Sequence, residues 1–162
     1  MATDYFKEII GKNFTLLIMH NNEKGNFEML DVKAVLLKPN GIRKRIGYAS
    51  MGIKDEEKRA ELCNIYIEPY FRHREIGGKM LRLMVDFYKD DKAQEIFGDI
   101  TASKVPKKAK NFYAKNNFSI IEKESQEGKN IKIKLILKKT QDPQFYYLHK
   151  IEPITKNEYF SI

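Results

Sequence analysis

The sequence predicts a single α/β domain in which helices pack against a mixed β-sheet. Two observations lead to this fold class. Short apolar segments with the period of a strand come before and after two segments with the period of a helix. The chain is also long enough, at 162 residues with 42% hydrophobic residues, to bury a core of its own. Charged residues make up 32% and aromatic residues 12%, a balance that excludes a disordered or low-complexity chain.

Four strands are predicted in the N-terminal part of the chain, with turn residues between the first three. Residues 25–26 are Gly-Asn, and residues 38–41 are Lys-Pro-Asn-Gly, in which proline presets φ and Asn-Gly tolerates a positive φ. The fourth strand is apolar on both faces, which favours a central position in the sheet and a buried packing role for Cys63. The predicted strands span Phe14 to His20, Met29 to Lys38, Ile42 to Met51 and Glu61 to Glu68.

Helices and strands alternate in the rest of the chain. Apolar residues recur every three or four positions from Ile76 to about Lys89, which predicts a helix packed on the sheet. Pro106 suits the first turn of a second helix, and Asn116-Asn117 ends it. The remaining predicted elements are a strand at Ile96 to Thr101 and a hairpin with strands at Phe118 to Glu122 and Ile131 to Lys138.

Several classes of protein are excluded by composition. The longest apolar runs have four residues, far below the roughly 20 that a membrane span needs. No secretory signal is readable at the N-terminus, so we expect a cytoplasmic protein with no membrane partner. Cys63 is the only cysteine and the three histidines are scattered, which excludes an internal disulfide and predicts no metal site.

The positive charge of the chain is concentrated in one segment. The formal net charge is +8, and residues 101–140 contain eleven lysines against three glutamates. A segment of this kind either meets an anionic partner, such as a phosphorylated cofactor or a nucleic acid, or forms an ordinary solvated face. Composition alone leaves both interpretations open.

A glycine pair opens the first predicted helix, directly after a short loop that follows the fourth strand. Free N–H groups and the positive end of the helix dipole make such a start a site for an anion, and Arg72 and Arg74 flank it. Alternatively, Gly77 and Gly78 serve tight packing only, although each costs a helix roughly 1 kcal/mol against alanine. His73 in the same loop either binds phosphate when charged or is simply exposed. The patterns GxxxxGK[ST] and GxGxxG are both absent.

Two motifs in this order resemble those of the GNAT superfamily, the acyl-CoA-dependent N-acetyltransferases. Residues 72–77, RHREIG, resemble the family pattern [Q/R]xxGx[G/A], with Glu75 where the first glycine is usual. Residues 109–118, AKNFYAKNNF, are similar to the family segment A-x-x-[aliphatic or aromatic]-Y-x-x-x-G-F, with Asn117 in place of the glycine. Pro106 stands where an asparagine often contacts the cofactor.

The resemblance covers residues 42–138 and implies a fold. It implies a mostly antiparallel central sheet of six to seven strands with flanking helices, in a single domain over residues 1–162. Strands occupy the N-terminal part, where many relatives have two helices, so we expect these helices to be reduced. Three roles are possible for the aromatic tail, residues 141–162. It covers the sheet, contributes to a homodimer interface or shapes the acceptor pocket.

The resemblance also implies an activity, the transfer of an acetyl group from acetyl-CoA to a primary amine in a direct ternary complex. Glu61 is the candidate base that removes the proton of the amine, and a solvated carboxylate is the alternative. Tyr113 is the candidate acid for the departing thiolate, and a core aromatic residue is the alternative. A backbone N–H of the fourth strand would stabilise the thioester oxygen. The residues expected to bind acetyl-CoA are Ile65, Tyr66, Ile67, Arg72, His73, Arg74, Ile76, Gly77, Gly78 and Lys110.

A second hypothesis is an inactive module that binds nucleic acid or an acidic protein through its lysines. Glu75 motivates it, because a carboxylate in a phosphate site opposes pyrophosphate. Since no RNP-like stacking motif is present, we do not expect a nucleic-acid partner. The acceptor is either a small-molecule amine or a protein amine, and the sequence does not distinguish them.

Overall fold

The computed structural model describes residues 2–22, 27–54, 58–88, 93–104, 106–137 and 151–162. The predicted Gly25-Asn26 turn and the aromatic residues at 145–147 lie outside these ranges. The strands are β1 (Ala2–Gly11), β2 (Phe14–Asn22), β3 (Phe27–Leu37), β4 (Arg43–Lys54), β5 (Arg59–Ile67), β6 (Glu95–Asp99), β7 (Ser119–Ser125), β8 (Gly128–Ile136) and β9 (Glu152–Pro153). The helices are the 3₁₀ turn η1 (Pro69–Phe71), α1 (Ile76–Tyr88), α2 (Pro106–Lys115) and α3 (Lys156–Phe160).

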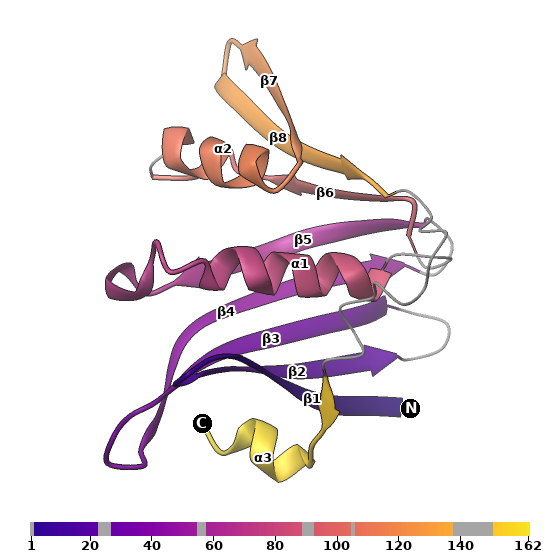
Figure 1. The fold of residues 1–162 in the computed structure, drawn as a ribbon. Helices are drawn as coiled ribbons and strands as arrows, with labels where there is room; N and C mark the ends of the chain where they lie inside the picture. Colours follow the sequence, from indigo (N-terminus) through magenta and orange to yellow (C-terminus); the bar gives the residue numbers. More distant parts are fainter. Residues whose placement is uncertain (1, 23–26, 55–57, 89–92, 105, 138–150) are drawn as a thin grey trace.

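The strands form one mixed sheet in the order β7-β8-β6-β5-β4-β3-β2-β1-β9 (Figure 1). Neighbouring strands are antiparallel except β5 and β6, which are parallel and are connected through α1. Among the described residues no helix precedes η1, so the expected loss of the N-terminal helices is confirmed. The mixed, mostly antiparallel α/β fold is confirmed as well.

The predicted number of strands was wrong, because the sheet has nine strands in place of six to seven. Sequence analysis missed β1 and β9. Charged residues interrupt the alternation of β1, where even Glu8 is buried. β9 has two residues, and one of them is Pro153, a residue that β-strands disfavour. β1 forms a hairpin with the neighbouring β2, whereas β9 is defined by pairing with Phe6 and Lys7, which are distant in sequence.

Helices cover the two faces of the sheet unequally. α1 lies across β3, β4 and β5, and α2 lies on the same face near β6 and β7 (Figure 1). The predicted apolar stripe of α1 is confirmed, since Met80, Leu83, Met84 and Phe87 are buried in the main core. On the opposite face, Tyr159 of α3 packs against Leu17 in a second, smaller cluster. None of the described helices has the length and apolar content of a membrane span.

A β-bulge in β5 corrects the prediction that Cys63 is buried. Ser50 of β4 pairs with Asn64 and Met51 pairs with Leu62, so Cys63 is the extra residue of the bulge. The bulge shifts the alternation by one position, which brings Leu62 and Ile65 to the same face. Cys63 is exposed on the other face. The apolar character of β5 on both faces therefore reflects the bulge and not burial on two sides.

Candidate active site

The N-terminus of α1 has the backbone features of an anion-binding helix start. The Lys79 N–H donates to the Glu75 carbonyl over 3.0 Å, so Glu75 is the residue that caps the helix. The N–H groups in the first turn have no intrahelical acceptor. His73 and Glu75 have positive φ values of 65° and 61°, on either side of Arg74. Alternating left-handed residues turn successive N–H groups toward one point and form a concave anion site.

Packing within the chain does not require the two glycines. A Cβ at Gly77 would lie 3.4 Å from Phe112 Cε2, and a Cβ at Gly78 would lie 3.6 Å from Asn116 Oδ1. Both distances are ordinary van der Waals contacts, so alanine would fit at either position. The packing interpretation of the glycine pair is therefore weak, and close approach of a ligand remains the better reason for it.

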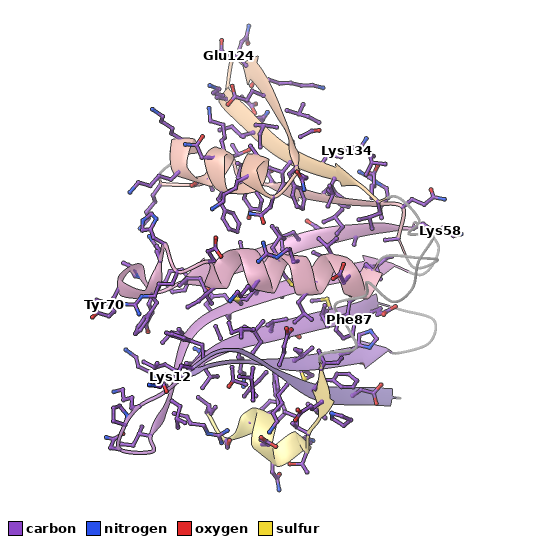
Figure 2. All side chains as sticks on the ribbon, viewed as in Figure 1. Lys12, Lys58, Tyr70, Phe87, Glu124 and Lys134 are labelled. Atoms are coloured by element: carbon purple, nitrogen blue, oxygen red, sulfur yellow. The ribbon has the colours of Figure 1, made fainter. Side chains whose placement is uncertain are left out.

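Two guanidinium groups lie in the loop before α1. Arg72 Nε donates to the Ile67 carbonyl over 2.8 Å, which orients its side chain along the end of β5. The Arg74 guanidinium carbon is 5.5 Å from the centre of the Tyr70 ring. Figure 2 shows Tyr70 projecting outward from this loop, at the far end of α1 from Phe87. Both arginines and His73 are exposed, so their charged groups are available to an anion.

The strands β5 and β6 separate beside this site. They are paired only from Arg59 to Glu61 of β5 and from Glu95 to Phe97 of β6. Beyond Glu61, the described residues of β5 continue to Ile67 without pairing to β6, and the two strands diverge in Figure 1. β6 continues to pair with β8. The open segment of β5 leads from the point of separation to the loop that opens α1.

Backbone groups of β5 face the separation. The Glu68 N–H donates to the Ile46 carbonyl over 2.8 Å. Because hydrogen-bonded pairs alternate along an antiparallel ladder, the backbone groups of Tyr66 face β4. Those of Ile65 and Ile67 face the opposite side, toward the gap. The gap therefore has donors and acceptors for an extended ligand.

Tyr113 is positioned by the end of α2. The Phe118 N–H donates to the Tyr113 carbonyl over 3.0 Å, and the Asn117 N–H donates to the Ala114 carbonyl over 3.1 Å. This is a Schellman motif, in which Asn117 has the left-handed φ of 71°. The Tyr113 side chain is buried in the main core, and burial raises the pKa of Tyr113 to about 12. At neutral pH the phenol keeps its proton and is a hydrogen-bond donor.

Glu61 lies where β5 and β6 part. It pairs with Phe97 and, among the described residues, is the last residue of β5 that pairs with β6. Its neighbours Ala60 and Leu62 point into the core under α1, so the Glu61 side chain faces the opposite side of the sheet and is exposed. The structure thus places the candidate base at the vertex of the separation, on the other face from Tyr113.

Lys110, a predicted ligand of the cofactor, forms an ion pair with another described residue. Its Nζ lies 2.6 Å from Glu122 Oε1 of β7. Hydrogen bonds from Lys110 and Lys129 lower the pKa of the Glu122 carboxyl, so the pair stays ionised. A phosphate contact by Lys110 would have to compete with Glu122.

Sequence analysis missed a row of polar residues on the face opposite α1. Asp31 of β3, Ser50 of β4 and Asn64 of β5 are cross-strand neighbours. Asn64 Nδ2 donates to Ser50 Oγ over 3.4 Å. The local signal was only a carboxylate within an apolar strand, because the row exists through strand register. Among the described residues there is no group of three or more side chains placed to bind a metal ion.

A family model described as an Acetyltransferase (GNAT) domain matches residues 35–120. No curated protein matches the chain by sequence. Solved structures with a similar fold include a GNAT-family acetyltransferase from Staphylococcus aureus, with 17% identity over 68% of this chain and 68% of that chain and a TM-score of 0.53.

Two further structures are similar. The PaiA N-acetyltransferase from Thermoplasma acidophilum, in complex with coenzyme A, has 20% identity over 67% of this chain and 60% of that chain, with a TM-score of 0.51. Nourseothricin acetyltransferase has 13% identity over 75% of this chain and 72% of that chain, with a TM-score of 0.55. At these identities the likeness shows a shared fold.

Proposed function

Since this chain belongs to the GNAT family of acetyltransferases, we propose that it transfers an acetyl group from acetyl-CoA to a primary amine while both substrates are bound. One observation carries the proposal: β5 parts from β6 directly beside a helix N-terminus shaped for an anion. The acceptor is a small-molecule amine or a protein amine.

The residues around the gap fit acetyl-CoA, a ligand with a pyrophosphate at one end and amide groups along its arm. The first turn of α1 would bind the pyrophosphate through the N–H groups of Ile76, Gly77 and Gly78, with the cations of the preceding loop beside them. The backbone groups of Ile65 and the N–H of Ile67 would bind the amides of the arm, since the Ile67 carbonyl already accepts from Arg72. When bound, acetyl-CoA supplies an acyl group activated as a thioester. The full set of proposed binding residues is Ile65, Tyr66, Ile67, Arg72, His73, Arg74, Ile76, Gly77, Gly78 and Lys110.

Glu61 is proposed as the base. An aliphatic amine with a pKa near 10 is protonated at neutral pH and does not attack until it loses a proton. Glu61 is exposed at the vertex of the gap, where it accepts this proton directly or through a water molecule. An N–H of the open segment of β5 would stabilise negative charge on the acyl oxygen.

Tyr113 is proposed to donate a hydrogen bond to the departing thiolate. Its phenol is protonated at all pH values at which an enzyme of this kind works, since its pKa is raised to about 12. The thiol of CoA has a pKa near that of cysteine, so its thiolate is a weak base. A hydrogen bond from the Tyr113 phenol therefore stabilises the thiolate as it departs, before any proton is transferred.

The alternative of an inactive, lysine-dependent binder lacks a supporting observation. Ion pairs engage several lysines of the basic segment. They are Lys110 and Lys129 with Glu122, Lys132 with Asp99, and Lys134 with Glu95. In the described part of the chain, therefore, part of the positive charge is neutralised within the fold.

Two measurements test the proposed function. Millimolar CoA, at a micromolar Kd, stabilises a protein by about 4 kcal/mol, which is a rise in melting temperature of about 10 °C for a chain of this length. The double variant Arg72→Ala/Arg74→Ala should lose most of this rise, whereas Lys156→Ala, an exposed cation of α3, should keep it. Release of free thiol from acetyl-CoA in the presence of amines tests the transfer. The proposal is wrong if CoA gives no thermal shift and no amine elicits thiol release.

A further inference from the structure

The two proposed substrates would enter the gap between β5 and β6 from opposite faces of the sheet. α1 and α2 lie on one face, and the anion site opens between their ends, so the proposed cofactor reaches the gap from that face. The acceptor then meets the thioester from the opposite face, where Glu61 lies. The described residues that form this face near the gap belong to β3, β4 and β5.

Cross-strand neighbours on these three strands form rows of side chains near the point where β5 and β6 separate. One row consists of Asp31, Ser50 and Asn64, and the next row consists of Met29, Gly52 and Glu61. Gly52 contributes no side chain between Met29 and Glu61. The row of Asp31 thus runs straight across the sheet to the bulge of β5, beside the candidate base.

Asp31 is a half-buried carboxylate that lacks a cation of its own. Within the described ranges no salt bridge involves it. Its neighbour Lys33 is engaged elsewhere, since Lys33 Nζ donates to the Tyr159 carbonyl over 3.1 Å and lies 4.1 Å from the centre of that ring. Burial raises the pKa of Asp31 and outweighs the opposite effect of Lys33. A cationic ligand would offset this cost of burial.

The distance from Asp31 to β5, the strand that borders the gap, limits the length of the ligand. Neighbouring strands are about 4.8 Å apart, so Asp31 on β3 lies about 10 Å from the row position on β5. An ammonium–carboxylate contact takes up about 3 Å of this distance. About 7 Å remains between the reacting nitrogen and a second nitrogen, which is close to the span of a four-carbon or five-carbon diamine.

We infer that Asp31 is a specificity-determining residue that binds a second ammonium group of the acceptor, which makes the acceptor an aliphatic diamine or polyamine. The inference rests on the proposed acetyl transfer. Asp31 binds the amine that does not react, whereas Glu61 takes the proton of the amine that does. The rest of the row, Ser50 and Asn64, provides uncharged hydrogen-bonding groups along the carbon chain.

Three four-carbon amines whose far ends are cationic, neutral or anionic test the inference. They are 1,4-diaminobutane, 1-aminobutane and 4-aminobutanoate, compared by thiol release from acetyl-CoA. The wild-type chain should prefer the diamine over the monoamine by about tenfold or more in kcat/KM, and should use the aminobutanoate least, since its carboxylate meets Asp31.

The variant Asp31→Asn keeps the shape of the side chain and removes its charge. It should lower kcat/KM for the diamine by about tenfold, through KM, and leave the monoamine within about twofold. Asp31→Glu should retain part of the preference. Asp4→Asn, which removes an exposed carboxylate of β1, serves as the matched control and should leave all three rates unchanged.

The outcomes separate this inference from the proposed function. Equal loss of rate for all acceptors in Asp31→Asn indicates a structural role and overturns the inference, as does a wild-type chain that acetylates amines without preferring the diamine. If the wild-type chain neither binds CoA nor releases thiol with any amine, the proposed function fails and the inference fails with it. Melting curves of Asp31→Asn show whether the variant is folded, and we expect an unchanged or higher melting temperature.

Discussion

Tyr113 and Phe118 are held against each other by the end of α2. The Phe118 N–H donates to the Tyr113 carbonyl over 3.0 Å, and the two ring centres are 5.6 Å apart. Asn117 makes this geometry by taking a φ of 71°. The position of the candidate acid therefore depends on a single left-handed residue.

The first prediction concerns that residue. Asn117→Gly should keep or slightly raise the free energy of unfolding, because glycine adopts the left-handed conformation without strain. Asn117→Ala should lower it by about 1 kcal/mol, because a Cβ is disfavoured there. Urea unfolding of the two variants measures the difference, and equal stability would show that the φ of Asn117 carries no strain.

The second prediction concerns Tyr113→Phe. Loss of the hydroxyl should lower kcat by about tenfold to a hundredfold and leave the Kd of CoA within about twofold. Thiol release gives kcat, and titration calorimetry gives the Kd. Phe112→Leu, which keeps a bulky apolar side chain next to Tyr113, is the control for general disturbance of α2. An unchanged kcat in Tyr113→Phe would remove the phenol from the mechanism.

The third prediction is an alkaline loss of stability. The pKa of Tyr113 is raised by burial to about 12 from an ordinary value near 10, so the unfolded chain releases this proton before the folded chain does. The contribution is fully present below pH 10 and is lost as the pH rises from 10 to 12. Burial raises the pKa of Tyr88 and Tyr159 in the same direction. Urea midpoints measured across this range should fall, and they should fall less steeply in Tyr113→Phe.

The fourth prediction concerns Glu75. Glu75 is exposed, directly precedes α1 at the proposed anion site and has a φ of 61°. Glu75→Gly removes both the charge and the strain, and should tighten CoA binding by about threefold to tenfold. Glu75→Ala removes only the charge, so the difference between the two Kd values isolates the backbone effect. If both variants bind CoA more weakly, Glu75 is itself a ligand contact and the phosphate site is organised differently.

The fifth prediction separates stability from binding at Gly77. Since a Cβ there would be 3.4 Å from the nearest atom of Phe112, Gly77→Ala should fold and gain up to about 1 kcal/mol in the free energy of unfolding from its helix propensity. The same methyl group should weaken CoA binding if a ligand approaches this backbone closely. Gly128→Ala, at the start of β8 where φ is 119°, should show the reverse pattern, with lost stability and unchanged binding.

Local sequence patterns predicted the elements that are bounded by characteristic turn or capping residues. The turn at residues 38–41 is an example, because Gly41 has a φ of 83° and its N–H donates to the Lys38 carbonyl. α1 was predicted from its apolar period, and the end of α2 from Asn116-Asn117. In each case the determining residues are neighbours in the sequence.

Features that depend on register could not be predicted in this way. The bulge at Cys63 is defined by the pairing of β5 with β4. It places Cys63 on the exposed face, although the alternation of apolar residues in β5 suggested that this side chain is buried. The row of Asp31, Ser50 and Asn64 also could not be predicted, because its three residues come from three strands and meet only through strand register. The candidate residues Glu61 and Tyr113 came from motif resemblance, and the structure adds that they lie on opposite faces of the sheet.

The short contact between β5 and β6 also has a mechanical consequence. Among the described residues, three residue pairs join the part of the sheet that contains β6, β7 and β8 to the part that contains β5 and the N-terminal strands. Amide hydrogens in the two parts should therefore exchange with solvent through separate opening events. A ligand bound in the gap would supply hydrogen bonds between β5 and β6 where the strands do not pair. The amide hydrogens of the two parts should then exchange through a shared opening event.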